Sequence, residues 1–202
     1  MARWEPDARG RLERAAMELF QERGYASTTV GDIAERAGLT ERTFFRHFTD
    51  KREVLFSGSK ELEKKIVEQL SSAPKDVRPL DALVAALEHV GAWLQANRDF
   101  SYVRARYALV TDHAEVRERE LIKMAGLSAA IAKALQLRGV SEPTASVVAE
   151  AGMTVFKVGF ERWVHAKKPG ELAAHIRAAV ETLKAVTAPA APSRPRAAHQ
   201  KV

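Results

Sequence analysis

The chain has 202 residues, 46% of them hydrophobic, and a formal net charge of +6. That size and composition are enough for one or two packed domains. The absence of cysteine excludes disulfides and thiolate zinc sites, and no apolar run approaches the roughly 20 residues that a membrane-spanning helix needs. The N-terminus also lacks the core of a signal peptide, so we expect a cytoplasmic protein with no membrane partner.

The basic charge is compatible with a nucleic-acid partner, but it is spread unevenly. Residues 1–52 carry ten Lys and Arg against nine Asp and Glu, whereas the tail adds Arg194, Arg196 and Lys201 with no acid after Glu181. Bulk charge therefore does not indicate DNA binding, which depends on where particular cations lie.

The first predicted helix begins close to three arginines, Arg3, Arg9 and Arg11. These arginines have two possible interpretations: a basic arm against DNA, or a solvated, frayed end. The helix has an apolar face at helical spacing and ends at Gly24. That face comprises Leu12, Ala15, Ala16, Leu19 and Phe20.

Two short helices are predicted next, on either side of Gly38, which suits a tight turn. Thr29 caps the first helix and Asp32 completes a capping box, while Thr40 caps the second. The apolar positions that should face inward are Val30, Ile33, Ala34 and Ala37 on the first helix and Phe44 and Phe48 on the second.

This pattern is typical of a helix-turn-helix, whose second helix enters the major groove of DNA. An ordinary helical hairpin with a polar outer face also fits the spacing, so both interpretations remain open from spacing alone. The outward positions of the second helix are Thr40, Glu41, Arg42, Thr43, Arg46 and His47.

A longer helix is predicted from Lys51 to about Leu70, because Asp50 and Glu53 form a third cap signature. Lys51 would then lie at a helix N-terminus, where backbone N–H groups favour an anion, and we expect it to bind a DNA phosphate. Two prolines interrupt the periodicity between residues 71 and 79. We place the domain boundary there, with residues 1–52 as the DNA-binding domain and helix 51–70 as the connection.

Residues 71–187 are the second predicted domain. From Leu80 onward the periodicity is helical only, with stripes that end near Asn97, Val110, Gly139, Pro169 and Thr187. The helix that Ser141 caps is apolar on two faces, and Gly152 and Gly159 allow a neighbouring helix to approach it closely. We interpret the last two helices as a homodimer interface of four helices, although the extra face could instead close a monomer core. The expected interface residues are Ala151, Val155, Val158, Arg162, Ile176, Val180 and Leu183. The remaining residues 188–202 are basic and rich in Pro and Ala, which predicts a disordered tail.

No catalytic signature is found. The sequence has no phosphate-binding glycine loop, no HExxH motif and no nucleophile elbow, and its six histidines are scattered with no pair at i, i+4. We therefore predict that the protein is not an enzyme and has no metal site or cofactor.

The segment from Arg11 to Phe56 closely resembles the DNA-binding domain of TetR-type transcriptional regulators. The resemblance depends on several separated landmarks: Leu19-Phe20, Gly24-Tyr25, Thr28-Thr29, Ile33-Ala34, Ala37-Gly38, Thr43-Phe44, His47-Phe48 and Lys51. It implies an all-α protein, with an N-terminal three-helix helix-turn-helix domain and a C-terminal helical domain that binds a ligand and dimerises.

The resemblance also implies roles for residues of the second helix. Arg42 and Arg46 are expected to contact guanine edges or phosphates. Thr40 and Thr43 would contact thymine methyls or phosphate, and Glu41 would accept a hydrogen bond from cytosine. Backbone contacts that set the register are assigned to Thr29, His47 and Lys51. Phe45 stands where the family often has a tyrosine that donates to phosphate, so only apolar contact is expected there.

The resemblance further implies a small-molecule pocket in the C-terminal domain, with an apolar lining and few polar groups. The candidate lining residues are His89, Trp93, Phe100, Tyr107, Met124, Met153, Phe156 and Phe160, although plain core packing accounts for many of them equally well. The predicted function is a sequence-specific DNA-binding transcriptional regulator, a repressor released from an inverted-repeat operator by a small apolar ligand. A ligand-independent regulator or activator, and a helical dimeric interaction module, remain alternatives.

Overall fold

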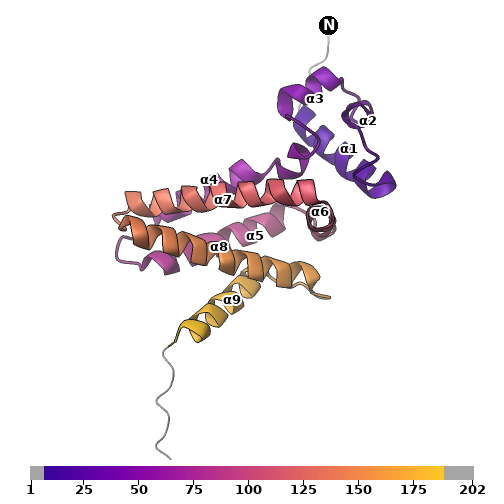
Figure 1. Cartoon of the computed structure of the whole chain (residues 1–202). Coiled ribbons are helices and arrows are strands. Elements are labelled where there is room, and N and C mark those ends of the chain that lie inside the picture. The colour runs from indigo at the N-terminus through magenta and orange to yellow at the C-terminus, as the bar shows by residue number, and fades with distance from the viewer. Residues whose placement is uncertain (1–6, 189–202) are drawn as a thin grey trace, which may run out of the picture.

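The computed structural model describes residues 7–188, and every regular element within that range is a helix. Three helices, α1 (Ala8–Arg23), α2 (Val30–Arg36) and α3 (Glu41–His47), form a head at one end of the molecule (Figure 1). Arg3, one of the three N-terminal arginines, and the predicted disordered tail from residue 189 onward lie outside the described residues. No described helix is long and apolar enough to cross a membrane.

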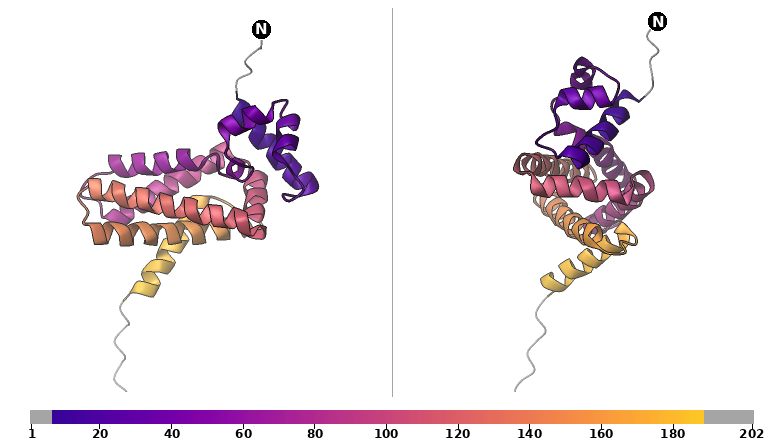
Figure 2. Two further views of the ribbon diagram at one scale, coloured as in Figure 1. Left: turned by 45° about the horizontal axis from the view of Figure 1, so that its top comes forward. Right: turned by 90° about the vertical axis from the view of Figure 1, so that its right-hand side faces the viewer.

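The remaining helices form an elongated bundle (Figure 2). They are α4 (Ser59–Ser72), α5 (Pro79–Asn97), α6 (Phe100–Asp112), α7 (Ala114–Leu137), α8 (Glu142–His165) and α9 (Leu172–Thr187). Helix α9 packs on α8 and α5, and α7 packs on α4 and α8. The all-α prediction and the order of helices are therefore confirmed.

The caps of the head form as the sequence predicts. Thr29 and Asp32 make a reciprocal capping box at α2, and the Thr40 side chain accepts a hydrogen bond from the Thr43 amide at α3. Gly38 has a φ of +64° in the turn between them, a left-handed conformation that favours glycine. In contrast, Ser141 precedes α8 without making the predicted capping hydrogen bond.

The prediction of a continuous helix from Lys51 to Leu70 is wrong. A short 3-10 helix, η1 (Glu53–Phe56), comes first, and α4 begins only after Gly58. Two backbone carbonyls that a continuous helix would use internally are engaged elsewhere. Arg106 of α6 donates to the Leu55 carbonyl at 2.7 Å, and Arg9 of α1 donates to the Ser57 carbonyl at 2.9 Å.

Two apolar cores result, and the first one crosses the expected boundary between head and bundle. The head core includes Val54, Leu55 and Phe56 of η1, together with Val110 of α6 and Val116 of α7. The second core lies along α4 to α9. Because α6 and α7 supply side chains to the head core, the head is packed directly on the bundle.

Close helix packing depends on two glycines of α8, as the sequence predicts. A methyl group on Gly152 would overlap the Leu83 side chain of α5. A methyl group on Gly159 would lie 3.0 Å from backbone atoms of Ile176 in α9, and a backbone cannot rotate aside. Glycine at position 159 therefore sets the distance between α8 and α9.

We predict that Gly159→Ala lowers the free energy of unfolding by about 1–3 kcal/mol, because the added methyl separates α8 from α9. Gly126→Ala in α7 is the matched control, since a methyl there meets no atom within 4 Å. The control should raise stability by about 0.5–1 kcal/mol through helix propensity. Denaturant unfolding measures both changes, and equal stabilities for the two variants would contradict this packing.

Candidate nucleic-acid interface and effector cavity

The outward side of α3 presents a mixed cationic and apolar surface. Arg42, Phe45 and Arg46 are exposed, with Phe45 at 55%, whereas Phe44 and Phe48 are buried at 0% and 4%. Neither arginine makes an ion pair with another described residue. The two inward phenylalanines therefore fix the orientation of the helix and leave both guanidinium groups free to meet a polyanion.

Thr29 at the start of α2, and the threonines and the acid at the start of α3, make contacts within the head. The Thr29 hydroxyl and amide both bind the Asp32 carboxylate, and these hydrogen bonds lower the pKa of Asp32. Thr40 and Thr43 share a hydrogen bond of 3.1 Å between their hydroxyl oxygens. The Glu41 carboxylate lies against Gly31 at the start of α2, so it points toward the head's own backbone.

His47, at the end of α3, carries little positive charge at neutral pH. Its side chain is partly buried, and the pKa of the imidazole is lowered by burial and then by the nearby charges of Arg46 and Arg9. Its Nε2 atom is buried and has no hydrogen-bond partner within the described part of the chain. A phosphate contact by His47 would therefore depend on a neutral hydrogen bond.

Lys51 makes its contacts within the head. Its ammonium group donates to the carbonyls of Tyr25 and Thr28 at 2.8 and 3.1 Å and lies 4.3 Å from the centre of the Tyr25 ring. The helix N-terminus predicted at this position does not exist, since η1 begins at Glu53. The structure thus places Lys51 at the junction between α1 and α2.

The two N-terminal arginines that the structure describes also make contacts within the protein. Arg9 binds the Ser57 carbonyl and stacks over the Phe48 ring, and Arg11 donates to the Ala37 carbonyl in the turn before α3. Both lie within α1, so the interpretations of Arg9 and Arg11 as a flexible arm or a frayed end are wrong.

A cavity of about 300 Å³ lies between α4, α5, α6, α7 and α8, and η1 forms one of its walls. Four of the eight predicted pocket residues line it, namely Trp93, Met124, Phe156 and Phe160. His89 is exposed on α5, Met153 is buried in the bundle core, and Phe100 and Tyr107 pack against Trp163 and Phe160.

Sequence reasoning missed the polar lining of this cavity. Arg98, Arg106, Glu120 and Lys123 all line it, as do Leu55 and Phe56 of the head core. Their positions gave no signal in the sequence, because they come from the end of α5, from α6 and from α7 and meet only in the folded chain. The connection to η1 appears only in three dimensions.

The predicted dimer residues are divided between core and surface. Val155, Ile176 and Val180 are buried inside the chain, at 3%, 0% and 6% exposure, and Leu183 is half-buried on the same side of α9. Ala151, Val158 and Arg162 instead lie along the outer face of α8. Within the described residues, no group of three or more His, Asp or Glu side chains is arranged to hold a metal ion.

Residues 13–57, which include α2, α3 and their caps, match the family described as bacterial regulatory proteins, tetR family. This segment of the chain thus matches the TetR family. Its head therefore carries the helix-turn-helix of that family.

Similar proteins agree with this assignment. The HTH-type transcriptional regulator TcmR of Streptomyces glaucescens is 39% identical over 82 residues, which cover 41% of this chain and 36% of TcmR. The HTH-type transcriptional repressor KstR2 of Mycobacterium tuberculosis is 29% identical over 108 residues, or 53% of this chain and 51% of KstR2. The chain thus spans about half or less of these curated relatives.

A solved structure is similar over nearly the whole chain. It is FadR of Thermus thermophilus, a TetR family transcriptional repressor in complex with lauroyl-CoA. The TM-score is 0.56 at 25% identity, covering 93% of this chain and 100% of FadR. The likeness extends across head and bundle together.

We predict that Lys51→Met lowers the free energy of unfolding by about 1–3 kcal/mol, because two carbonyls lose a charged donor. The salt dependence of DNA binding, measured as the slope of log affinity against log salt, should stay unchanged. Denaturant unfolding and salt titrations measure the two effects. A stable variant whose slope falls by about one unit would instead place Lys51 on a phosphate.

Proposed function

We propose that this protein is a dimeric, sequence-specific DNA-binding transcriptional repressor that a small, largely apolar molecule releases from an inverted-repeat operator. The outward surface of α3 is the observation that carries the proposal. Arg42, Phe45 and Arg46 project from a helix that buried aromatic side chains and two capped helix ends hold in place.

Each of these three side chains suits a feature of the major groove. An arginine pairs in a bidentate manner with the O6 and N7 atoms of guanine, and an exposed phenylalanine packs against a thymine methyl group. Thr40 and Thr43 are expected to contact phosphates, while Glu41, turned toward Gly31, is expected to contribute little to base recognition.

Dimerisation is proposed through the outer face of α8 and α9. Val147, Ala151, Thr154 and Val158 follow one another at helical spacing on α8, and Val147 is 69% exposed. Small residues, including Ala174 and Ala178, line the outer side of α9. Two copies that join these faces would present two α3 helices to successive major grooves, about 34–36 Å apart.

Ligand control is supported by the position of the cavity. Its wall includes Leu55 and Phe56, which also belong to the head core, so a bound molecule would press on the head. FadR, the similar structure, holds lauroyl-CoA, an apolar acyl chain on a charged carrier. We expect the effector of this chain to be apolar over most of its length.

We predict that Arg46→Ala weakens operator binding by about tenfold to a hundredfold, since one good bidentate contact is worth about 1–3 kcal/mol. The operator comes from selection of bound sequences out of random duplexes. Binding is then measured by gel shift, with thermal unfolding as the control for an intact fold. Failure to select any sequence, or salt-independent binding, would favour a helical interaction module instead of a regulator.

We predict that a charge on the outer face of α8 separates the dimer. Thr154→Glu should sediment as a folded monomer, because two copies of the added carboxylate would face each other across the two-fold axis. Lys75→Glu, in the loop before α5, is the matched control and should remain a dimer. Val155→Glu should unfold instead, since Val155 is buried within its own chain. A dimeric Thr154→Glu would move the interface elsewhere.

A further inference from the structure

The cavity is apolar along most of its wall, and more cations than acids line it. Four cations line it, Lys60, Arg98, Arg106 and Lys123, against two acids, Glu63 and Glu120. A cationic ligand would meet this excess of like charge. An anionic group would be attracted to it, and more strongly than at an open surface because the site is partly shielded from water.

Three of these cations also hold the head on the bundle. Arg98 binds Glu13 of α1 at 3.2 Å, and Lys123 binds Glu53 of η1 at 3.1 Å. The two carboxylates are largely buried, with side-chain exposures of 10% and 15%. The same ammonium and guanidinium groups therefore face the cavity on one side and the head's acids on the other.

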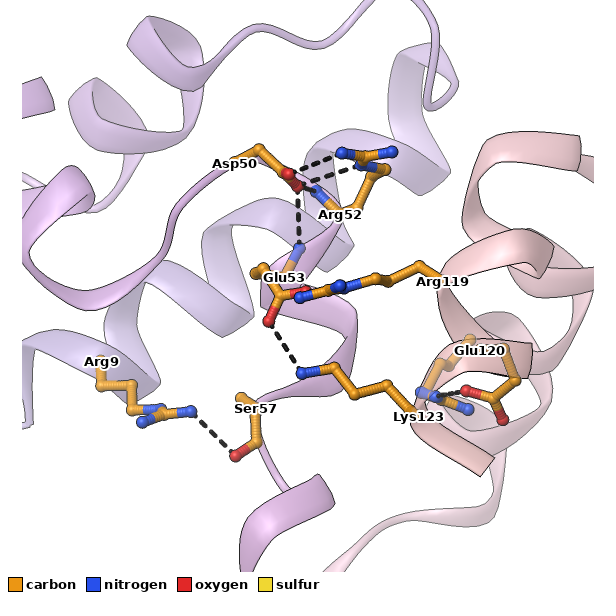
Figure 3. Close-up of polar contacts among 9 residues, drawn as sticks. Arg9, Asp50, Arg52, Glu53, Ser57, Arg119, Glu120 and Lys123 are labelled. Atoms are coloured by element: carbon orange, nitrogen blue, oxygen red, sulfur yellow. Dashed lines mark hydrogen bonds and ion pairs between the residues drawn. The ribbon is translucent and has the colours of Figure 1, made fainter. Parts of the chain in front are cut away.

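Arg106 makes the third connection. Its Nε donates to the Leu55 carbonyl of η1 at 2.7 Å, its Nη2 donates to Glu120 at 2.8 Å, and its guanidinium lies 5.1 Å from the centre of the Phe56 ring. Figure 3 shows Arg119 and Lys123 of α7 reaching the Glu53 carboxylate, with Glu120 close by on α7. The polar contacts that hold η1 on the bundle thus come from α6 and α7, two of the helices that line the cavity.

We propose, resting on the function proposed above, that the effector is a largely apolar molecule with one terminal acidic group. The acidic group binds Lys123 and Arg106 in competition with Glu53 and Glu120. The apolar part of the ligand lies against Trp93, Met124 and Phe156. Carboxylate and phosphate groups share this chemistry, and the experiment below distinguishes them.

This competition explains how ligand binding in the cavity affects the position of α3. Once Lys123 turns to the ligand, Glu53 keeps only Arg119 as a partner. Once Arg106 turns to it, the Leu55 carbonyl loses its donor. Both changes loosen η1 from α6 and α7 and so favour a head position that differs from the DNA-binding one. A ligand shifts such an equilibrium only through its different affinity for the two states.

The test uses the full chain and three probes that each have ten carbon atoms: decanoate, decyl phosphate and 1-decanol. Trp93 lines the cavity, so tryptophan fluorescence reports binding. We expect at least one of the two acids to bind tenfold or more tightly than the alcohol. The tighter of the two assigns the acidic group. Equal affinity of all three probes, or tighter binding of the alcohol, would overturn the proposal.

Variants at Lys123 test the assigned residue. Lys123→Met should weaken binding of the preferred acid by about tenfold to a hundredfold and change binding of 1-decanol by less than about twofold. Lys123→Arg keeps the charge and should restore the preference for the acid, which excludes a folding defect as the cause. Lys133→Met, on the exposed side of α7, is the matched control and should behave like the parent protein.

DNA release separates this inference from the proposed function. With the selected operator, the preferred acid should release the parent protein. Lys123→Met, which lacks the pair with Glu53, should bind the operator more weakly without acid and respond less when the acid is added. Operator binding that saturating acid leaves unchanged would overturn the competition with Glu53. A parent protein that binds no DNA, yet prefers the acid through Lys123, would overturn the proposed function and leave the acid site supported.

Discussion

The ion pairs of Glu53 hold the two parts of this molecule together. Arg119 and Lys123 of α7 both bind its carboxylate, which is only 15% exposed. Burial alone raises the pKa of Glu53, but the hydrogen bonds from the two cations outweigh burial and the pKa lies below its usual value. The charged form is therefore favoured in the folded protein, and its contribution to stability is present above the unfolded pKa and lost as the pH falls through the folded one.

The helix η1, which carries Glu53, contacts both the head core and the bundle. The side chains of Val54, Leu55 and Phe56 are buried in the head core, while the Leu55 carbonyl and the Glu53 carboxylate are bound by the bundle. The same segment forms a wall of the cavity. Since packed cores have few intermediate arrangements, a small displacement of this wall is transmitted to the head as a whole.

The head was predictable because its signals are local. The cap at Thr29, the turn at Gly38 and the inward pair Phe44 and Phe48 each depend on residues within four positions of one another. The break in the helix predicted from Lys51 was not predictable in this way. It depends on Arg9 and Arg106, which lie 48 and 51 positions from the carbonyls they bind.

The bundle was predictable in its helices and not in its surfaces. A helix with two apolar faces shows that both are covered, but periodicity does not say which one its own chain covers. The structure resolves this for Val155, which is buried, and for Val158, which lies toward the outside. The cavity had the same difficulty, because the sequence offers both Trp93 and Phe100 as aromatic candidates and only Trp93 lines it.

A double-mutant cycle on Glu53→Gln and Arg119→Met measures the central interaction most directly. Denaturant unfolding of the full chain, of both single variants and of the double variant gives the coupling energy between the two side chains. We predict a favourable coupling of about 1–3 kcal/mol, because the carboxylate is largely shielded from water. A coupling close to zero would show that the Glu53–Arg119 pair does not stabilise the contact between head and bundle and would contradict this account.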